Sequence, residues 1–226
     1  MKSINTIERI TLVFVFILVI VGVILSHGAP EFFKGTYVVE DGLIQWLQVA
    51  ALIMTMCLCF RRVVFLRKSK PAIFLAATLL LGLLFLFAVG EEISWGQRLF
   101  NIQSSEWFQE HNAQEEINLH NLVIKGTKIN RLIFSTGLGI IMIIYLAVIT
   151  PLYRRKGKLS RFIDSLAIPI PQTHHVIGYI ALVLIVQFLV ASSKKGELRE
   201  FGMLFLFFLN AAFPYNKEIF DSEKSV

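Results

Sequence analysis

Six stretches of apolar residues, separated by short polar segments, divide the chain. They lie at about residues 10–26, 42–60, 71–95, 132–153, 174–191 and 197–215. A helix needs about 20 apolar residues to cross the hydrocarbon core of a bilayer. The pattern therefore predicts an all-α integral membrane protein: a six-helix transmembrane bundle in which residues 1–226 form one membrane domain. The third helix is expected to continue through Trp95.

The first and last runs each allow a second interpretation. A run near the N-terminus can be a signal peptide, but the following residues 27–30 are a poor cleavage site, so we expect a retained span. The apolar part of the sixth run covers only residues 201–213. It reaches spanning length only with its polar flanks, so a re-entrant hairpin is the alternative.

Composition agrees with a membrane protein. Hydrophobic residues make up 55% of the chain, charged residues 17%, and phenylalanine occurs 20 times. A soluble protein of this size could not bury so much apolar surface, whereas lipid solvates it. The net charge of +6 does not indicate nucleic acid binding, because the basic residues form short clusters between the apolar runs. The lipid bilayer is the expected partner.

The basic clusters predict the orientation. Residues 61–70 hold five basic side chains and no acid, and residues 154–173 hold five against one acid. Two spans separate these loops, so they share a side, and the positive-inside rule places that side in the cytoplasm. We expect both termini there, with the protein in the cytoplasmic (inner) membrane. Apolar residues at helical spacing predict a short amphipathic helix at 159–167 on this surface, ended by Pro169 and Pro171.

The predicted outer side carries most of the acids. Residues 27–41, 91–131 and 192–200 hold 11 of the 16 acidic residues. The outer loop 101–130, between spans 3 and 4, also contains many apolar residues, so we expect it to be ordered and partly helical. Acids contribute little to topology. Their concentration outside therefore suggests a function.

The first candidate element is the adjacent pair Glu91 and Glu92, which follows a wholly apolar run. Carboxylates near the hydrocarbon boundary are costly unless they are paired, protonated or bound to a cation. On a continuous helix, Glu92 would share a stripe with Gly96, which leaves space beside the carboxylate. Glu91 would share its stripe with Ser94, Trp95 and Arg98. The alternative is that both acids simply end the span and are solvated.

The second element is residues 112–122. If this segment is helical, Asn112, Glu116 and His120 lie on one stripe, and Glu116 with His120 can ligate one cation. The alternative is a solvated amphipathic helix with an ordinary hydrogen bond between residues four apart. Further acids precede the sixth run (Glu200) and the second run (Glu40 and Asp41), at the same membrane boundary.

The other reactive side chains, the two cysteines and the histidine pair, are interpreted as structural residues. Cys57 and Cys59 are interpreted as small apolar side chains, since the chain has no further cysteine to complete a thiolate site. The pair His174 and His175 is expected on the cytoplasmic side, away from the acids, as cap or interface residues.

Two motifs give a resemblance. G-E-E-I-S-W-G-Q-R at residues 90–98 is followed by N-x-Q-x-E-x-N-L-H-N at residues 112–121, and E-D-G at residues 40–42 fits the same pattern. This combination resembles an uncharacterised family of bacterial multi-pass membrane proteins. The resemblance implies a bacterial membrane protein and adds no reaction.

Together these elements predict a metal-dependent, membrane-embedded hydrolase or transferase acting on a lipid or lipid-linked substrate. The candidate catalytic residues are Glu91, Glu92, Glu116 and His120, and the candidate metal ligands are Glu92, Glu116, His120 and Glu200. Residues expected to hold them in place are Gln97, Arg98, Asn112 and Asn121. A carboxylate and imidazole set suits zinc, manganese or iron.

Two other functions remain open. The chain could be an accessory or assembly protein of the cell envelope that docks a partner through its outer loop. A carrier of ions or solutes is less favoured, because the sequence shows no inverted repeat and its acids gather at one face.

Overall fold

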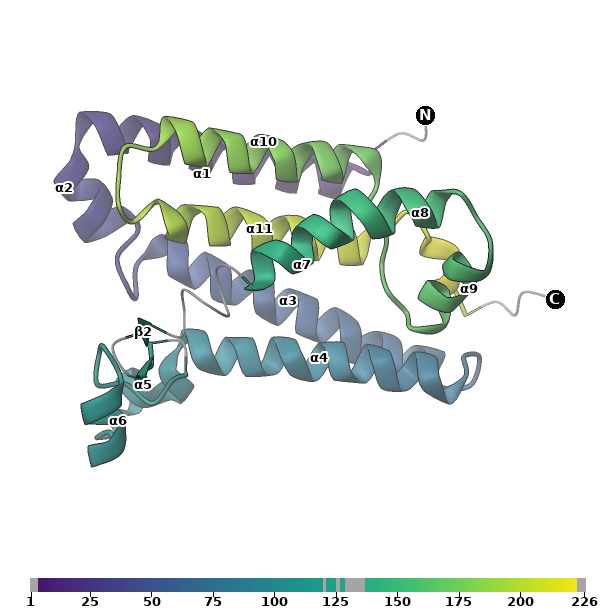
Figure 1. Ribbon diagram of the computed structural model, residues 1–226, viewed down its shortest axis with the longest axis horizontal. Helices are drawn as coiled ribbons and strands as arrows, with labels where there is room; N and C mark the ends of the chain where they lie inside the picture. Colours follow the sequence, from purple (N-terminus) through teal and green to yellow (C-terminus); the bar gives the residue numbers. More distant parts are fainter. Residues whose placement is uncertain (1–3, 120, 125–126, 129–136, 223–226) are drawn as a thin grey trace.

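The computed structural model describes residues 4–119, 121–124, 127–128 and 137–222. Most of this part is helical, and strands β1 (Val123–Ile124) and β2 (Thr127–Lys128) form one short antiparallel hairpin. The long helices lie side by side, and a small unit containing α5 and α6 sits at one end of α4 (Figure 1). The predicted helical class is confirmed, with this hairpin as a small addition.

Among the described residues, three helices are long and apolar enough to cross a membrane: α1 (Thr6–Gly28), α3 (Leu43–Leu66) and α4 (Ala72–Glu92). The apolar helices of residues 138–154 and α10 (Thr173–Leu189) have at most 17 residues each. Helix α11 (Lys195–Ala212) has 18 residues but begins with several charged side chains. The six-span count therefore stays a prediction. Because α11 is one continuous helix, no hairpin forms within it.

The predicted helix through Trp95 was wrong, since α4 ends at Glu92. Ser94, Trp95 and Gly96 have φ angles of 48°, 53° and 80°. A right-handed helix cannot continue through such residues, and the chain turns away from the α4 axis. Consequently Glu92 and Gly96 share no helical stripe, and Glu91 shares none with Arg98.

Helix α11 forms the centre of the bundle, packing against α1, α3 and α10. Its residues Leu198, Phe201 and Leu206 are completely buried. Close packing against α10 requires a glycine, because a Cβ at Gly202 would lie 2.5 Å from Leu182 Cδ1. The first two turns of α11, which carry the acids, are thereby fixed beside the neighbouring helices.

The fourth apolar run is a helix with a π-helical middle, made of α7 (Leu138–Ile144), η4 (Tyr145–Ile149) and α8 (Thr150–Arg154). The predicted amphipathic helix is confirmed as α9 (Lys158–Ser165), in which Ile163 is buried and Phe162 is exposed.

The two ends of the bundle differ as the basic clusters predict. The start of α1, the turn between α3 and α4, and α9 lie at one end (Figure 1). Segment η5 (Lys217–Phe220) joins them, since Arg62 at the end of α3 lies 3.7 Å over the Phe220 ring. Helix α2 (Pro30–Phe32), segment η1 (Phe33–Tyr37) and the α5–α6 unit lie at the opposite end. Which end faces the cytoplasm stays a prediction.

Candidate functional site

The segment after α4 folds back on itself at the predicted outer end. It contains η2 (Ser94–Gly96), α5 (Gln97–Phe100) and α6 (Glu106–His111). The predicted helix over 112–122 was wrong: the described residues there are not helical, and Asn112 pairs with Leu122 in a β-bridge. The Asn112 side chain accepts from Gln114 N at 2.9 Å and donates to Asn118 O at 2.8 Å. Such side-chain bonds compete with helix formation.

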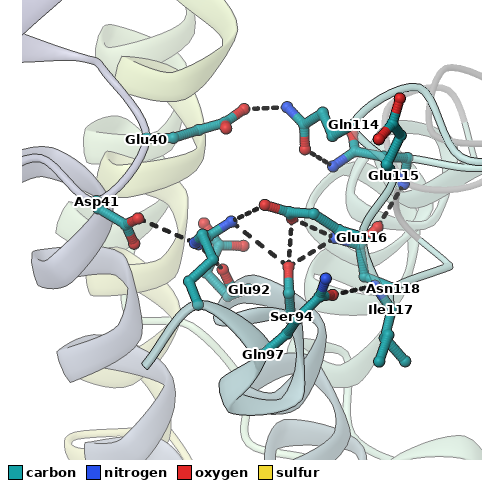
Figure 2. Close-up of polar contacts among 12 residues, drawn as sticks. Glu40, Asp41, Glu92, Ser94, Gln97, Gln114, Glu115, Glu116, Ile117 and Asn118 are labelled. Carbon is teal, nitrogen blue, oxygen red and sulfur yellow. Dashed lines mark hydrogen bonds and ion pairs between the residues drawn. The ribbon is translucent and has the colours of Figure 1, made fainter. Parts of the chain in front are cut away.

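Glu116 is surrounded by hydrogen-bond donors. Arg98 Nη1 donates to Glu116 Oε1 at 2.6 Å. The other carboxylate oxygen, Oε2, accepts from the Ser94 hydroxyl and from Asn118 Nδ2, the latter at 3.0 Å. Figure 2 shows Ser94, Glu116 and Asn118 converging on this point. Both oxygens of Glu116 are thus engaged by the protein itself.

Glu91 is engaged in the same way. Trp95 Nε1 donates to Glu91 Oε1 at 2.9 Å, and the backbone N–H of Leu119 donates to Oε2 at 2.7 Å. Gln97, which was expected to hold the site residues in place, has a partner in the loop. Gln97 Oε1 accepts from Ile117 N at 2.6 Å. We call the set Glu91, Ser94, Arg98, Glu116 and Asn118 the outer clamp.

Arg98 connects the outer clamp to the start of α3. Its Nε lies 2.9 Å from Asp41 Oδ2 and its Nη1 lies 2.6 Å from Glu116 Oε1, so Asp41 and Glu116 share one guanidinium. Partial burial alone lowers the pKa of Arg98, but the hydrogen bond and charge of Glu116 and the charge of Asp41 outweigh it and raise that pKa above its ordinary value. Arg98 is therefore a permanent cation already shared by two carboxylates.

Amide side chains complete the connection. Gln114 Nε2 donates to Glu40 Oε1, and Asn121 Nδ2 donates to Gln114 Oε1. Asn121 N also donates to Asn118 Oδ1 at 3.0 Å. Asn112 and Asn121, predicted to support metal ligands, thus hold the loop in shape. His120, the predicted imidazole ligand, lies outside the described residues.

A second set of acids lies beside the clamp: Glu40, Glu92, Glu197 and Glu200, here called the outer acid group. Helix α3 packs against both α4 and α11, so the ends that carry these acids are neighbours. The charge of Glu92 interacts with those of Glu197 and Glu200, and Glu40 acts on both Glu92 and Glu197. Glu92 and Glu200, two of the predicted metal ligands, therefore lie close enough for their charges to act on each other.

The outer clamp and the outer acid group differ in how the negative charges of their carboxylates are neutralised. Arg98 is divided between Asp41 and Glu116, although its charge still reaches Glu92. Lys194 acts on Glu197 and Arg199 on Glu200. Within the described ranges, the outer acids do not form a trio of His, Cys, Asp or Glu atoms close enough to hold a metal as they stand. A cation there would need ligands from substrate or solvent.

We call the segment of residues 94–119, which contains α5 and α6, the outer unit. Several of its large apolar side chains face outward. Phe100 is 74% exposed, and Trp95 and Trp107 are about half exposed. From the sequence, we expected the apolar residues of loop 101–130 to order it, but Trp107 and Leu119 are exposed, whereas Leu122 is buried. The described part of the loop is ordered mainly by its polar bonds.

Sequence reasoning missed a cluster at the opposite end. His174 Nε2 and His175 Nε2 each lie 2.6 Å from Glu8 Oε1. The pair lies at the end opposite the outer acids, as expected, but its contact with Glu8 was not predicted. The cap assignment holds, since the N–H of Gln172 donates to His175 Nδ1 at 3.3 Å. A signal was available, because the predicted topology puts the starts of the first and fifth runs on one side.

Comparison with known proteins gives no match: no family model, curated protein or solved structure is similar to this chain. The interpretation of the site therefore rests on its geometry.

Proposed function

We propose that this chain is a membrane-embedded hydrolase or transferase that acts on a lipid or lipid-linked substrate at the outer boundary of the bilayer. The observation that carries the proposal is the outer acid group. Glu92, at the end of an apolar helix, and Glu200, on the central helix, interact with each other and with Glu197. Carboxylates gathered beside a hydrocarbon boundary repel one another, and binding a cation relieves that repulsion.

The geometry favours a hard divalent cation such as Mn²⁺. Carboxylate, carbonyl and water oxygens suit magnesium and manganese, and such ions often bind through one or two carboxylates plus substrate phosphate oxygens. A preformed trio of protein ligands is then not required. In this reaction Glu92 and Glu200 would hold the cation, and the cation would activate water or a substrate hydroxyl. Glu197 would take the proton as general base.

Glu116 and Glu91 have a different part in this proposal. Their oxygens are occupied by donors from the clamp and from Trp95 and Leu119, so they position the reactive carboxylates and bind no metal. His120 stays a predicted ligand.

The proposed substrate class follows from the place of the acids. The outer acid group lies where apolar helices end, and Trp95 and Phe100 project apolar rings from the adjacent unit. Aromatic rings at this level suit the interface between headgroups and acyl chains. A phosphate-bearing lipid headgroup there would supply the missing oxygen ligands to the cation.

A second candidate function is docking of an envelope protein through the outer unit. The favouring observation is that Phe100 and Trp107 are exposed on a segment fixed by hydrogen bonds, a combination found at protein interfaces. Docking would require the exposed rings and would not require Glu92 or Glu200.

Lipid turnover tests the first candidate. The full chain would be reconstituted in vesicles of total bacterial polar lipids with Mn²⁺, and the lipids followed by mass spectrometry. We expect a new lipid species with the wild type and its loss with Glu92→Gln and with Glu200→Gln. Glu110 is an exposed acid on α6, outside the outer acid group. Glu110→Gln is therefore the matched control and should retain turnover.

The outcomes separate the two candidates. Equal lipid profiles for wild type and both variants would contradict the enzyme. Cross-linking in native membranes then tests docking: the adduct should persist in Glu92→Gln and disappear in the double variant Phe100→Ala, Trp107→Ala. An adduct that survives this double change would contradict the docking function.

A further inference from the structure

The predicted cytoplasmic end holds a group of potential metal ligands separate from the outer acids. In the described part of the chain, Glu8, His174 and His175 are the one trio of His, Cys, Asp or Glu side chains whose ligand atoms all lie within 4.8 Å of one another. Glu8 comes from the first turns of α1, and the histidines come from the start of α10. Helices α1 and α10 pack against each other, so the bundle itself fixes this trio.

Burial makes the Glu8 carboxylate require a cation or strong donors. Glu8 is 2% exposed and His175 is fully buried, whereas the His174 side chain is 25% exposed. A buried carboxylate is costly unless it is paired. The Asn5 N–H reaches Glu8 Oε2 over 3.4 Å, a long contact that does not neutralise the charge. The cost of burying the Glu8 carboxylate must therefore be offset at the imidazoles of His174 and His175.

The imidazole contacts are unusually crowded. Both Nε2 atoms lie 2.6 Å from the same oxygen, whereas N–H···O bonds are ordinarily about 2.9 Å long. The two rings meet edge to face with centroids 4.4 Å apart. Two nitrogens and one carboxylate oxygen thus point at one small volume, with partial access to solvent past His174.

We propose that Glu8, His174 and His175 bind a divalent transition-metal cation, with zinc as the best-suited ion. Zinc prefers imidazole nitrogen and carboxylate oxygen, and three protein ligands leave a fourth position for water. The exposed side of His174 provides that position. Bound there, the ion would neutralise Glu8 and join α1 to α10. This site is independent of the outer acid group.

Binding has a structural consequence at His175. A neutral imidazole that ligates zinc through Nε2 carries its proton on Nδ1. In the structure Nδ1 accepts from the Gln172 N–H over 3.3 Å, so zinc must displace this contact. The change of tautomer gives a spectroscopic signature that a simple cap would not show.

Zinc titration of the full chain in detergent, after removal of metals, tests the proposal. We expect about one equivalent of zinc per wild-type chain and a rise in thermal stability on loading. Glu8→Gln and His174→Ala should weaken zinc binding by more than the roughly 10–100-fold typical of residues that only support a ligand. His111→Ala, a histidine of the outer unit, is the matched control, and Glu92→Gln shows that this zinc is not held by the outer acids.

The variants and the wild type provide independent readouts. His174 is the most informative position because its partial exposure makes truncation least harmful to folding. Should His174→Ala fail to fold, nitrogen NMR of the wild-type histidines decides: zinc should move the His175 proton from Nε2 to Nδ1. Zinc binding that is equal in wild type, Glu8→Gln and His174→Ala, or histidine signals that do not change with zinc, would overturn the proposal.

Discussion

The outer clamp and the outer acid group lie side by side and both contain glutamates, yet the surroundings of these carboxylates differ. In the clamp, Glu91 and Glu116 receive donors on both oxygens. In the acid group, burial has the largest influence on Glu92, Glu197 and Glu200, and these carboxylates also lie close enough for their charges to act on one another. A carboxylate whose oxygens both accept hydrogen bonds stabilises a fold. Binding a cation would relieve the repulsion between neighbouring carboxylates. The comparison separates acids that stabilise the structure from acids that we propose to be reactive.

The largest expected effect comes from removing the clamp's cation. Arg98→Met leaves Glu116 and Asp41 without their shared partner. Because the Glu116 side chain is only 11% exposed, breaking its ion pair should destabilise the outer unit by about 2–3 kcal/mol. Hydrogen exchange of residues 112–119 should rise accordingly. Lys34→Met is the control, because its partner Glu31 is 93% exposed and the loss should be near zero. Unchanged exchange in Arg98→Met would mean that the clamp does not order the loop.

A smaller effect is expected at the other clamp carboxylate. Trp95→Phe removes the Nε1 donor to Glu91 but keeps the aromatic contact with Phe87, whose ring centroid lies 5.7 Å away. One hydrogen bond to a charged group should cost about 1.5 kcal/mol of unfolding free energy. Denaturant unfolding in detergent would measure it, with the exposed Trp107→Phe as control. Equal stability of the two variants would count against the role given to Glu91.

The smallest effect should have the opposite sign. Glu200→Gln removes one of the repelling charges, so the unfolding free energy should stay constant or rise by less than about 1 kcal/mol. The same denaturant experiment applies, with Glu106→Gln as a solvent-exposed control. A loss of stability in Glu200→Gln would show that this carboxylate is needed by the fold and belongs with the clamp acids.

The sequence predicted the elements better than the connections between them. Apolar runs and basic loops predicted the helices and which loops share an end, because lipid exposure and charge asymmetry are local properties of the chain. Acids at the ends of apolar runs predicted that Glu92 and Glu200 lie at one level of the membrane, but not that the helices carrying them are neighbours. The turn at Ser94 and Trp95 was missed, since positive φ at non-glycine residues follows from tertiary contacts with Glu116 and Glu91 rather than from propensity.

The same limitation explains the other misses. The spacing of Asn112 and Glu116 fits a helix, but amide side chains that bond to nearby backbone favour the irregular path observed. Glu8 and His175 are 167 positions apart, so only the three-dimensional structure could show that they touch. Residue type alone also could not separate Glu116 from Glu92.

The most direct test of the account compares Glu92→Gln with Glu116→Gln by denaturant unfolding in one detergent, with hydrogen exchange across the outer unit. Both changes remove one charge from neighbouring glutamates with almost no change of shape. We predict that Glu116→Gln loses about 2 kcal/mol, because Arg98 and Ser94 lose their anionic acceptor, while Glu92→Gln is at least as stable as the wild type. Equal destabilisation by the two changes, or a larger loss in Glu92→Gln, would contradict the division between structural and reactive carboxylates.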